Sequence, residues 1–384
     1  MKILLKKIRW KHFANYFVIT AFLLFFTVSS LTGGLRSSSQ YLLEKIGYSM
    51  ILAVSLSLVV GFLGELSLGH AGFMCVGAYL GGKTAALLVP VLGNGLPAFL
   101  IAMVVGGISA AVCGVIVGLP ALRLKGDYLA IVTLAFGEIV RSLFLNSSPE
   151  SFGGSLGLTS PRYDRGSLFI ITFVMVLLTL AAIQNLLRSR HGRAITAIRD
   201  SEIAARATGI NVTRYKLMAF AMSAFFAGIA GVLYSYANQT VQSSKFGFNY
   251  SIEILVMVVL GGMGSINGSL IAAALITYLN VKLTTVLTGD LAVLQNLVYA
   301  VVLIVIVIYG NAPFLASLRE KLDLGALLRR LTRKTDDPSF RRDDEKSWAR
   351  VPTKIKMDEL LSVDTRPEDH RAVRLDGDKP GNGG

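Results

Sequence analysis

Residues 188–236 read RSRHGRAITAIRDSEIAARATGINVTRYKLMAFAMSAFFAGIAGVLYSY, a basic polar segment followed at once by an apolar run. Seven residues of the polar part are basic: 188, 190, 193, 199, 206, 214 and 216. The apolar part, residues 217–236, has the length that a helix needs to cross a bilayer. A strongly basic segment beside such a helix predicts a surface loop of a membrane protein, placed where it can contact a partner.

Long apolar runs recur along the chain. Of its 384 residues, 53% are hydrophobic and 16% are charged, against roughly 25% charged in soluble domains. The pattern predicts an all-α, polytopic transmembrane bundle with about 8–10 spans, some of them broken. The runs are 13–31, 46–63, 71–89, 96–118, 128–145, 167–187, 217–236, 268–287 and 292–310, with a shorter one at 252–262.

Basic residues set the expected orientation, because cytoplasmic loops carry an excess of Lys and Arg. The N-terminal segment is basic, and counting spans from it places residues 64–70, 123–125 and 188–216 and the C-terminal tail in the cytoplasm. Residues 1–31 also resemble a signal peptide, with a basic start, an apolar middle and small residues at the end. We favour an uncleaved first span; either reading leaves the following loop outside.

Composition divides the chain into four parts. Residues 1–45 are expected to hold a cytoplasmic segment, the first span and an outer loop, and residues 46–312 the membrane core. Residues 313–334 predict either a basic amphipathic helix on the membrane surface or a frayed extension of the last span. Residues 335–384 are rich in charge, Pro and Gly, which predicts a disordered cytoplasmic tail.

The residue pattern argues against catalytic activity of the chain itself. The basic excess lies in residues 1–318, with 22 basic and ten acidic groups, and favours an anionic membrane surface over nucleic acid. The Cys and His residues lack metal-ligand spacing, and no nucleophile–base arrangement is present, so we expect no enzyme activity, cofactor or metal. Residues 77–84, GAYLGGKT, formally match a phosphate-binding loop. They lie inside an apolar run, where such a loop is not expected.

The pattern E-x-A-A-x-x-x-G at residues 202–209 predicts a short helix in the basic segment. Asp200 or Ser201 can cap its start, and Glu202 suits the first turn because the helix dipole favours an anion there. Gly209 can take the left-handed conformation that ends a helix. We expect about two turns, lying across the membrane normal and fitting a groove in a partner; an ordinary basic loop is the alternative. The candidate contact residues are Asp200, Glu202, Ala204, Ala205 and Gly209.

Two glycine-rich stretches interrupt the apolar runs, at residues 64–79 and 260–269. Glycine in a membrane lets helices approach closely, or breaks a helix where it lines a cavity. Broken segments in both halves of a chain point to a pathway between them, and helix packing alone is the alternative. The candidate pathway residues are Ser67, Gly69, His70, Gly72, Gly261, Gly262 and Gly264.

Glu138 places a carboxylate inside an apolar run, three residues before Arg141. This spacing allows both side chains to share one helix face. An intramembrane carboxylate is a functional candidate by default. We favour a structural ion pair near the outer interface.

At these motifs the chain resembles the permease subunits of branched-chain amino acid ABC importers, of the LivM type. The resemblance covers roughly residues 40–310. Within residues 202–209 the chain departs from the general E-A-A pattern of such permeases, because Ile203 stands where an alanine is usual. The stretches that carry it are LSLGHAGFMCVGAY (66–79), LRLKGDYLAIVTLAFGEIVR (122–141), GRAITAIRDSEIAARATGINVTRYKLMAFAMSAFFAGIAGVLY (192–234) and VVLGGMGSINGSLIAAAL (258–275).

The resemblance implies a division of labour. A similar permease pairs with a second, homologous permease, carries two ABC ATPase subunits on the cytoplasmic side of the plasma membrane, and receives substrate from an external binding protein. Residues 188–216 would hold the coupling helix, and an amino-acid carboxylate could meet half-helix N-termini at 66–72 or 261–268. A permease for urea or short amides is the alternative within the family. A stand-alone secondary transporter or channel is the alternative from another class.

Overall fold

The structure is a computed structural model and describes residues 37–93, 95–122, 127–161, 163, 165–286, 301 and 304. Several predictions therefore fall outside the described residues: the apolar run at 13–31, nearly all of the run at 292–310, the helix at 313–334 and the tail at 335–384. The basic pair at 123 and 125 lies outside them as well.

The described chain is almost entirely helical. Two very short strands pair antiparallel, with Leu158 opposite Val241 and Thr159 opposite Thr240. The elements are α2 (Ser37–Ser57) running into the π-helical η1 (Leu58–Leu63), α3 (His70–Leu92), α4 (Leu96–Ala121), α5 (Asp127–Leu145), α6 (Pro149–Phe152), η2 (Gly154–Leu156), β1 (Leu158–Thr159), α7 (Arg165–Arg188), α8 (Arg190–Asp200), α9 (Glu202–Ala207), α10 (Val212–Ala237), β2 (Thr240–Val241), η3 (Ser243–Phe246), α11 (Phe248–Leu260) and α12 (Ile266–Val286).

Seven of the described helices are long and apolar enough to cross a membrane, and α11 is a shorter apolar helix. The predicted all-α transmembrane bundle is therefore confirmed. The predicted runs mark the apolar centres of longer helices, since α2 begins at Ser37 and α10 at Val212. Their first turns are polar, so hydropathy alone places these starts too late.

The helices α2 and α10 form the interior of the bundle. Helix α10 packs against α3, α4 and α2, while α2 also packs against α7 and α12. Small residues bring these helices close: a Cβ atom on Gly77 of α3 would collide with the Gly228 carbonyl of α10. Close approach through small residues is the usual way in which helices associate in a membrane, where lipid is as apolar as a side chain.

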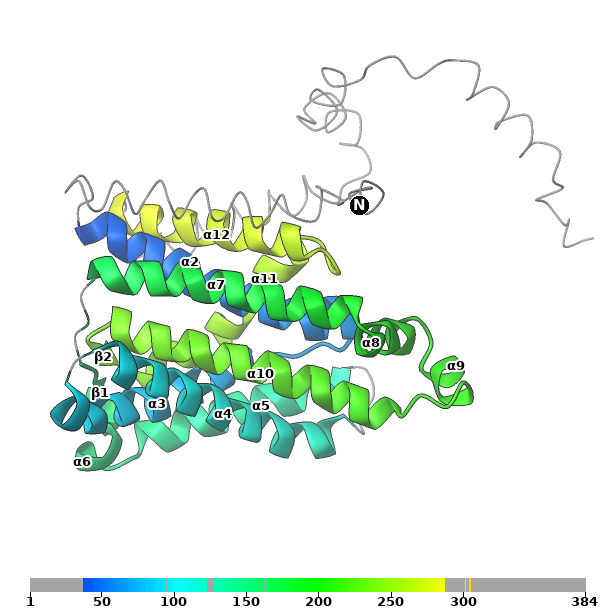
Figure 1. Cartoon of the computed structure of the whole chain (residues 1–384), viewed down its shortest axis with the longest axis horizontal. Coiled ribbons are helices and arrows are strands. Elements are labelled where there is room, and N and C mark those ends of the chain that lie inside the picture. The colour runs from blue at the N-terminus through cyan, green and yellow to red at the C-terminus, as the bar shows by residue number, and fades with distance from the viewer. Residues whose placement is uncertain are drawn as a thin grey trace, which may run out of the picture. The chain divides into compact units, whose positions relative to one another are not determined.

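The two ends of the bundle carry different elements (Figure 1). The long helices run side by side; β1, β2 and α6 lie at one end, and α8 and α9 at the other. Helix α8 is seen nearly end-on in this view, so its axis crosses the direction of the long helices. We call these ends the α6 end and the α9 end.

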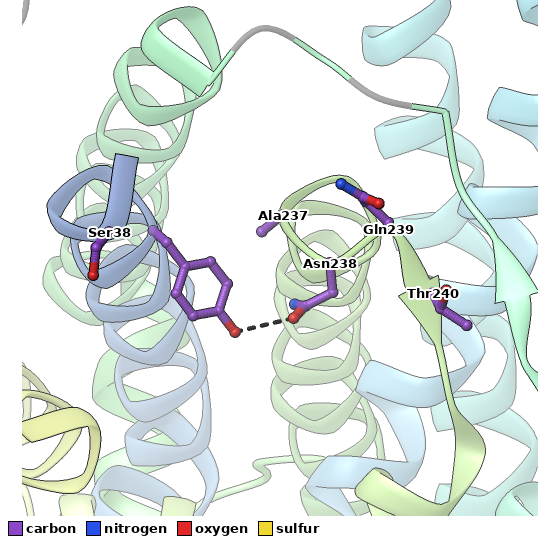
Figure 2. A pocket seen from close by; sticks show the side chains of 6 residues that line it. Ser38, Ala237, Asn238, Gln239 and Thr240 are labelled. Carbon is purple, nitrogen blue, oxygen red and sulfur yellow. Dashed lines mark hydrogen bonds between the residues drawn. The ribbon is translucent and has the colours of Figure 1, made fainter. Parts of the chain in front are cut away.

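An open cavity of ≈ 430 Å³ lies at the α6 end, between the start of α2 and the connection from α10 to β2. The Tyr41 hydroxyl donates to Asn238 Oδ1 at 3.0 Å, and this hydrogen bond is the dashed line that ends on Asn238 in Figure 2. None of the predicted site residues lines it; its lining residues are Ser38, Tyr41, Ala237, Asn238, Gln239 and Thr240.

Candidate functional site

The basic segment contains two helices rather than one. The expected short helix is α9 (Glu202–Ala207), and before it lies α8, an 11-residue helix that the sequence reading did not predict. Ser189 caps the start of helix α8: its Oγ accepts hydrogen bonds from the amides of His191 at 3.1 Å and Gly192 at 3.3 Å. Its buried face is formed by Ala194, Ile195 and Ile198. This cap and the apolar spacing are the signals that identify the helix.

Both ends of α9 are capped. At the start, Ser201 Oγ accepts a hydrogen bond from the Ala204 amide at 3.3 Å, whereas Asp200 pairs with Arg199 instead. At the end, Gly209 has a φ of 85°. The amides of Gly209 and Ile210 donate to the carbonyls of Arg206 at 3.0 Å and Ala205 at 3.1 Å, the two bonds of a Schellman motif.

Helix α9 turns Ala205 inward, holds Glu202 partly buried, and exposes its remaining residues. Ala205 is buried, while Ala204 and Ala207 are exposed. Ile203 is 83% exposed. A capped helix that exposes a large apolar side chain between small ones offers a smooth projecting surface, typical of an element that inserts into a groove. We call Ile203, Ala204 and Ala207 the α9 surface.

We expect Gly209→Ala to loosen α9 without unfolding the bundle. An alanine at a left-handed φ costs about 1 kcal/mol, which corresponds to roughly fivefold in a local opening equilibrium. Amide hydrogen exchange of residues 204–210 should therefore accelerate about fivefold. Gly209→Asn is the matched control, because asparagine tolerates this conformation; equal exchange rates in the two variants would contradict the prediction.

Two charged contacts fasten α9 and α8 to the bundle. The Lys216 ammonium, whose side chain is only 6% exposed, donates to Glu65 and, at 3.0 Å, to Glu202. Arg206 also pairs with Glu202, at 2.5 Å. Arg199 Nη1 donates to the Gly61 carbonyl at 3.2 Å.

The pKa of Glu202 is lowered by these contacts. Burial raises it, but the hydrogen bond and charge of Lys216, together with Arg206, outweigh burial and hold the pKa of this carboxyl below its ordinary value. A carboxyl with a lowered pKa in the folded state stabilises that state at neutral pH, and the stabilisation is lost as the pH falls through the lowered pKa. The contact is therefore intact at neutral pH.

The first glycine-rich stretch is a break between two helices. η1 ends at Leu63, and α3 begins only at His70, beside the middle of α5. The Leu68 amide donates to Thr133 Oγ1 at 3.0 Å, and His70 Nε2 lies 2.9 Å from Ser55 Oγ. Ser67 is buried, and its Oγ has no hydrogen-bond partner among the described residues.

Glycine is required where this break meets α5. A Cβ atom on Gly69 would collide with the carbonyl of Thr133, and one on Gly72 would lie 2.7 Å from the Cα of Gly137. By contrast, a Cβ on Gly137 would lie 3.8 Å from its nearest neighbour, an ordinary contact. The first turn of α3 is therefore held against the α5 backbone.

The second glycine-rich stretch joins α11 to α12. Gly262 and Gly264 have φ values of 89° and 83°, and Gly261 packs directly against Gly268. This turn lies beside the end of η1, since a Cβ on Gly61 would lie 2.6 Å from the Gly264 nitrogen. The predicted pathway residues thus form two groups: 67–72 lie deep in the bundle, and 261–264 lie near its α9 end.

A second helix start lies deep in the bundle, and the sequence reading missed it. Helix α11 begins at Phe248, and Ser251 Oγ in its first turn accepts the Ala71 amide of α3 at 3.3 Å. The first turns of α3 and α11 are therefore neighbours. The only sequence signal is Gly247, which precedes the apolar run by several residues.

Glu138 and Arg141 form an ion pair on α5, with 2.7 Å between Oε2 and Nε. Both side chains are half-buried. The other carboxylate oxygen, Oε1, accepts the Phe248 amide at 3.1 Å. The pair therefore caps the start of α11, which joins α5 to this helix.

A family model described as "Branched-chain amino acid transport system / permease component" matches residues 39–308, which include every helix from α3 to α12 and nearly all of α2. The chain belongs to this permease family. The permease is thus a multi-pass membrane protein of the branched-chain amino acid transport family, as the motifs predicted. The formal phosphate-loop match at residues 77–84 lies within α3, in continuous helix.

Individual relatives agree with this assignment. The permease is 40% identical over 258 residues to "High-affinity branched-chain amino acid transport system permease protein LivM" of Escherichia coli (strain K12), an alignment that covers 59% of each chain. It is 30% identical over 308 residues to "Ribose import permease protein RbsC" of the same organism, covering 75% of this chain and 87% of that one. The chain thus spans 59% of the length of its LivM relative.

One solved structure is also similar. A chain of "PsaBC from Streptococcus pneumoniae in complex with Fab" superposes with a TM-score of 0.41 and 16% sequence identity, covering 77% of this chain and 99% of that one.

Proposed function

We propose that the protein is the membrane permease subunit of an ATP-driven importer for branched-chain, hydrophobic amino acids in the plasma membrane. Two ABC ATPase subunits, a second homologous permease and an external substrate-binding protein are its partners. The family and the name of the 40% identical LivM relative support this cargo. The chain itself carries no reaction; ATP hydrolysis belongs to the partner ATPases.

The observation that carries the proposal is the projecting α9 surface. Helix α9 is capped at both ends and anchored through Lys216, and its Ile203 is exposed. Figure 1 shows α9 projecting beyond the ends of the long helices. The segment around it holds seven basic residues, which supports a cytoplasmic position for the α9 end. In this proposal, α9 is the coupling helix and enters a groove on an ATPase subunit.

Transport follows from a change between two states rather than from chemistry in the chain. Closure of the ATPases pulls on α9, and the bundle alternates between outward-open and inward-open arrangements because each is favoured by a different nucleotide state. The adjacent first turns of α3 and α11 lie deep in the bundle. The helix dipole at the start of α3 favours an anion, so the carboxylate of an amino acid suits this position in the pathway.

The test is reconstitution of the copurified complex in liposomes, with uptake of leucine, ribose and urea measured with and without ATP. ATP-dependent uptake of leucine above the other two is the expected result. Ribose is included because it appears in the name of the 30% identical relative. Urea represents the alternative substrate class within the family. Uptake by the permease alone, driven by an ion gradient, would overturn the proposal in favour of a secondary transporter or channel.

A further inference from the structure

Two cationic side chains connect the basic segment to the helix breaks, and neither belongs to the α9 surface. Arg199, at the end of α8, donates to the carbonyl of Gly61 in η1. Lys216, in the first turns of α10, contacts Glu65, two residues after η1. Both contacts fall where the chain leaves η1 and turns toward the start of α3.

The Lys216 contact joins three separate parts of the permease. Its ammonium is nearly inaccessible to water and is shared between Glu65 of the break and Glu202 of α9. A buried charge is tolerated only when it is paired, and removing one partner leaves it uncompensated. If α9 moves away from α10, the ammonium must either follow Glu202 and take Glu65 with it, or lose one of its two ionic contacts.

The Arg199 contact joins α8 to both glycine-rich breaks. A Cβ on Gly64 would lie 2.7 Å from Arg199 Cγ, and one on Gly264 would lie 3.6 Å from Nη1. The aliphatic stem of Arg199 thus occupies the space that a side chain on Gly64 would fill, and its guanidinium lies beside Gly264. Because Gly61 and Gly264 are also in contact, a displacement of Arg199 acts on the turn between α11 and α12 as well as on η1.

We propose that Arg199 and Lys216 are positioning residues that transmit movement of α9 to the 61–69 break and the 261–264 turn. This inference rests on the proposed coupling role of α9. The 61–69 segment leads directly to the first turn of α3, which lies against the first turn of α11 deep in the bundle. Shifting α9 therefore changes the distance between these two helix starts, and the pathway opens or closes between them.

The test measures leucine molecules transported per ATP hydrolysed in the reconstituted, full-length complex. Arg199→Gln removes a partly exposed side chain, so folding is not at risk, and Lys216→Met removes the buried charge at similar length. Both variants should assemble and hydrolyse ATP, but uptake per ATP should fall about tenfold, because movement of α9 is no longer passed on. Arg193→Gln is the control, since Arg193 is an exposed residue of the same helix.

Rescue variants distinguish a role of Lys216 in transmitting the movement of α9 from a purely structural role. Lys216→Arg keeps the charge and should restore the transport ratio, and the exchange Glu65→Lys with Lys216→Glu should restore part of it. An unchanged ratio in assembled Arg199→Gln would overturn the inference, whether or not Lys216→Met folds. Failure of the proposed function is distinguishable, because the unmodified complex would then show no ATP-dependent uptake.

Discussion

Replacing Ile203 with Asp is expected to detach the permease from the proposed ATPase partner while leaving the membrane bundle intact. The side chain is 83% exposed, so the substitution removes no internal packing. In the proposed complex it occupies the centre of the α9 surface, where an apolar anchor buried at an interface contributes about 2–4 kcal/mol, or roughly 30- to 1,000-fold in affinity. The Asp carboxylate would also lose its hydration in the interface without gaining a charged partner, which weakens binding further.

The measurement is copurification of the ATPase with tagged permease, followed by the affinity of the separated parts. Ile203→Leu should bind as the unmodified protein does. Thr213→Asp supplies a matched charge at another exposed position, in the first turn of α10, where the helix dipole accepts an anion. Equal loss of binding in Thr213→Asp would show that net charge, and not the α9 surface, controls assembly.

Replacing Gly69 with Ala is expected to destabilise the permease and to stop transport. The new Cβ would collide with the Thr133 carbonyl, which belongs to the α5 backbone and cannot rotate away. Relief requires moving the start of α3 away from α5, and overpacking of this kind costs about 1–3 kcal/mol. At roughly 2–4 °C per kcal/mol, the melting temperature should fall by about 5 °C.

Gly137→Ala is the matched control for this prediction. It introduces the same methyl group at the same contact between α3 and α5, but its Cβ has an ordinary 3.8 Å separation from the nearest atom. Melting temperature in detergent and leucine uptake in liposomes should both be close to those of the unmodified permease. A Gly69→Ala variant as stable and active as Gly137→Ala would show that the two helices separate freely here.

The fold was largely readable from hydropathy. Apolar runs separated by polar loops locate seven spans, because every backbone group in a membrane must be paired within a helix. Hydropathy could not locate the true starts of α2 and α10, whose first turns are polar. It also could not place the start of α3 deep in the bundle, because that depends on Thr133 and Ser251, which come from distant parts of the sequence.

The sequence predicted the candidate site only where the contacts form between residues that are close in the sequence. Ser201 and Gly209 cap α9 through neighbouring residues, and their types alone indicate this. The same is true of Ser189, which the sequence reading overlooked. The roles of Lys216 and Glu138 depend on partners more than 100 residues away, Glu65 and Phe248. No spacing rule predicts such contacts, since they arise from packing of the whole bundle.

The contact between the Arg199 stem and Gly64 has a consequence for how these two positions can change in evolution. The arginine stem fills the volume in which a side chain at position 64 would lie, and Gly64 also has a φ of 80°. The side chains at the two positions therefore compete for the same volume, and a substitution at one position limits the residues accepted at the other. A larger residue at position 64 is therefore expected together with a shorter or redirected side chain at position 199.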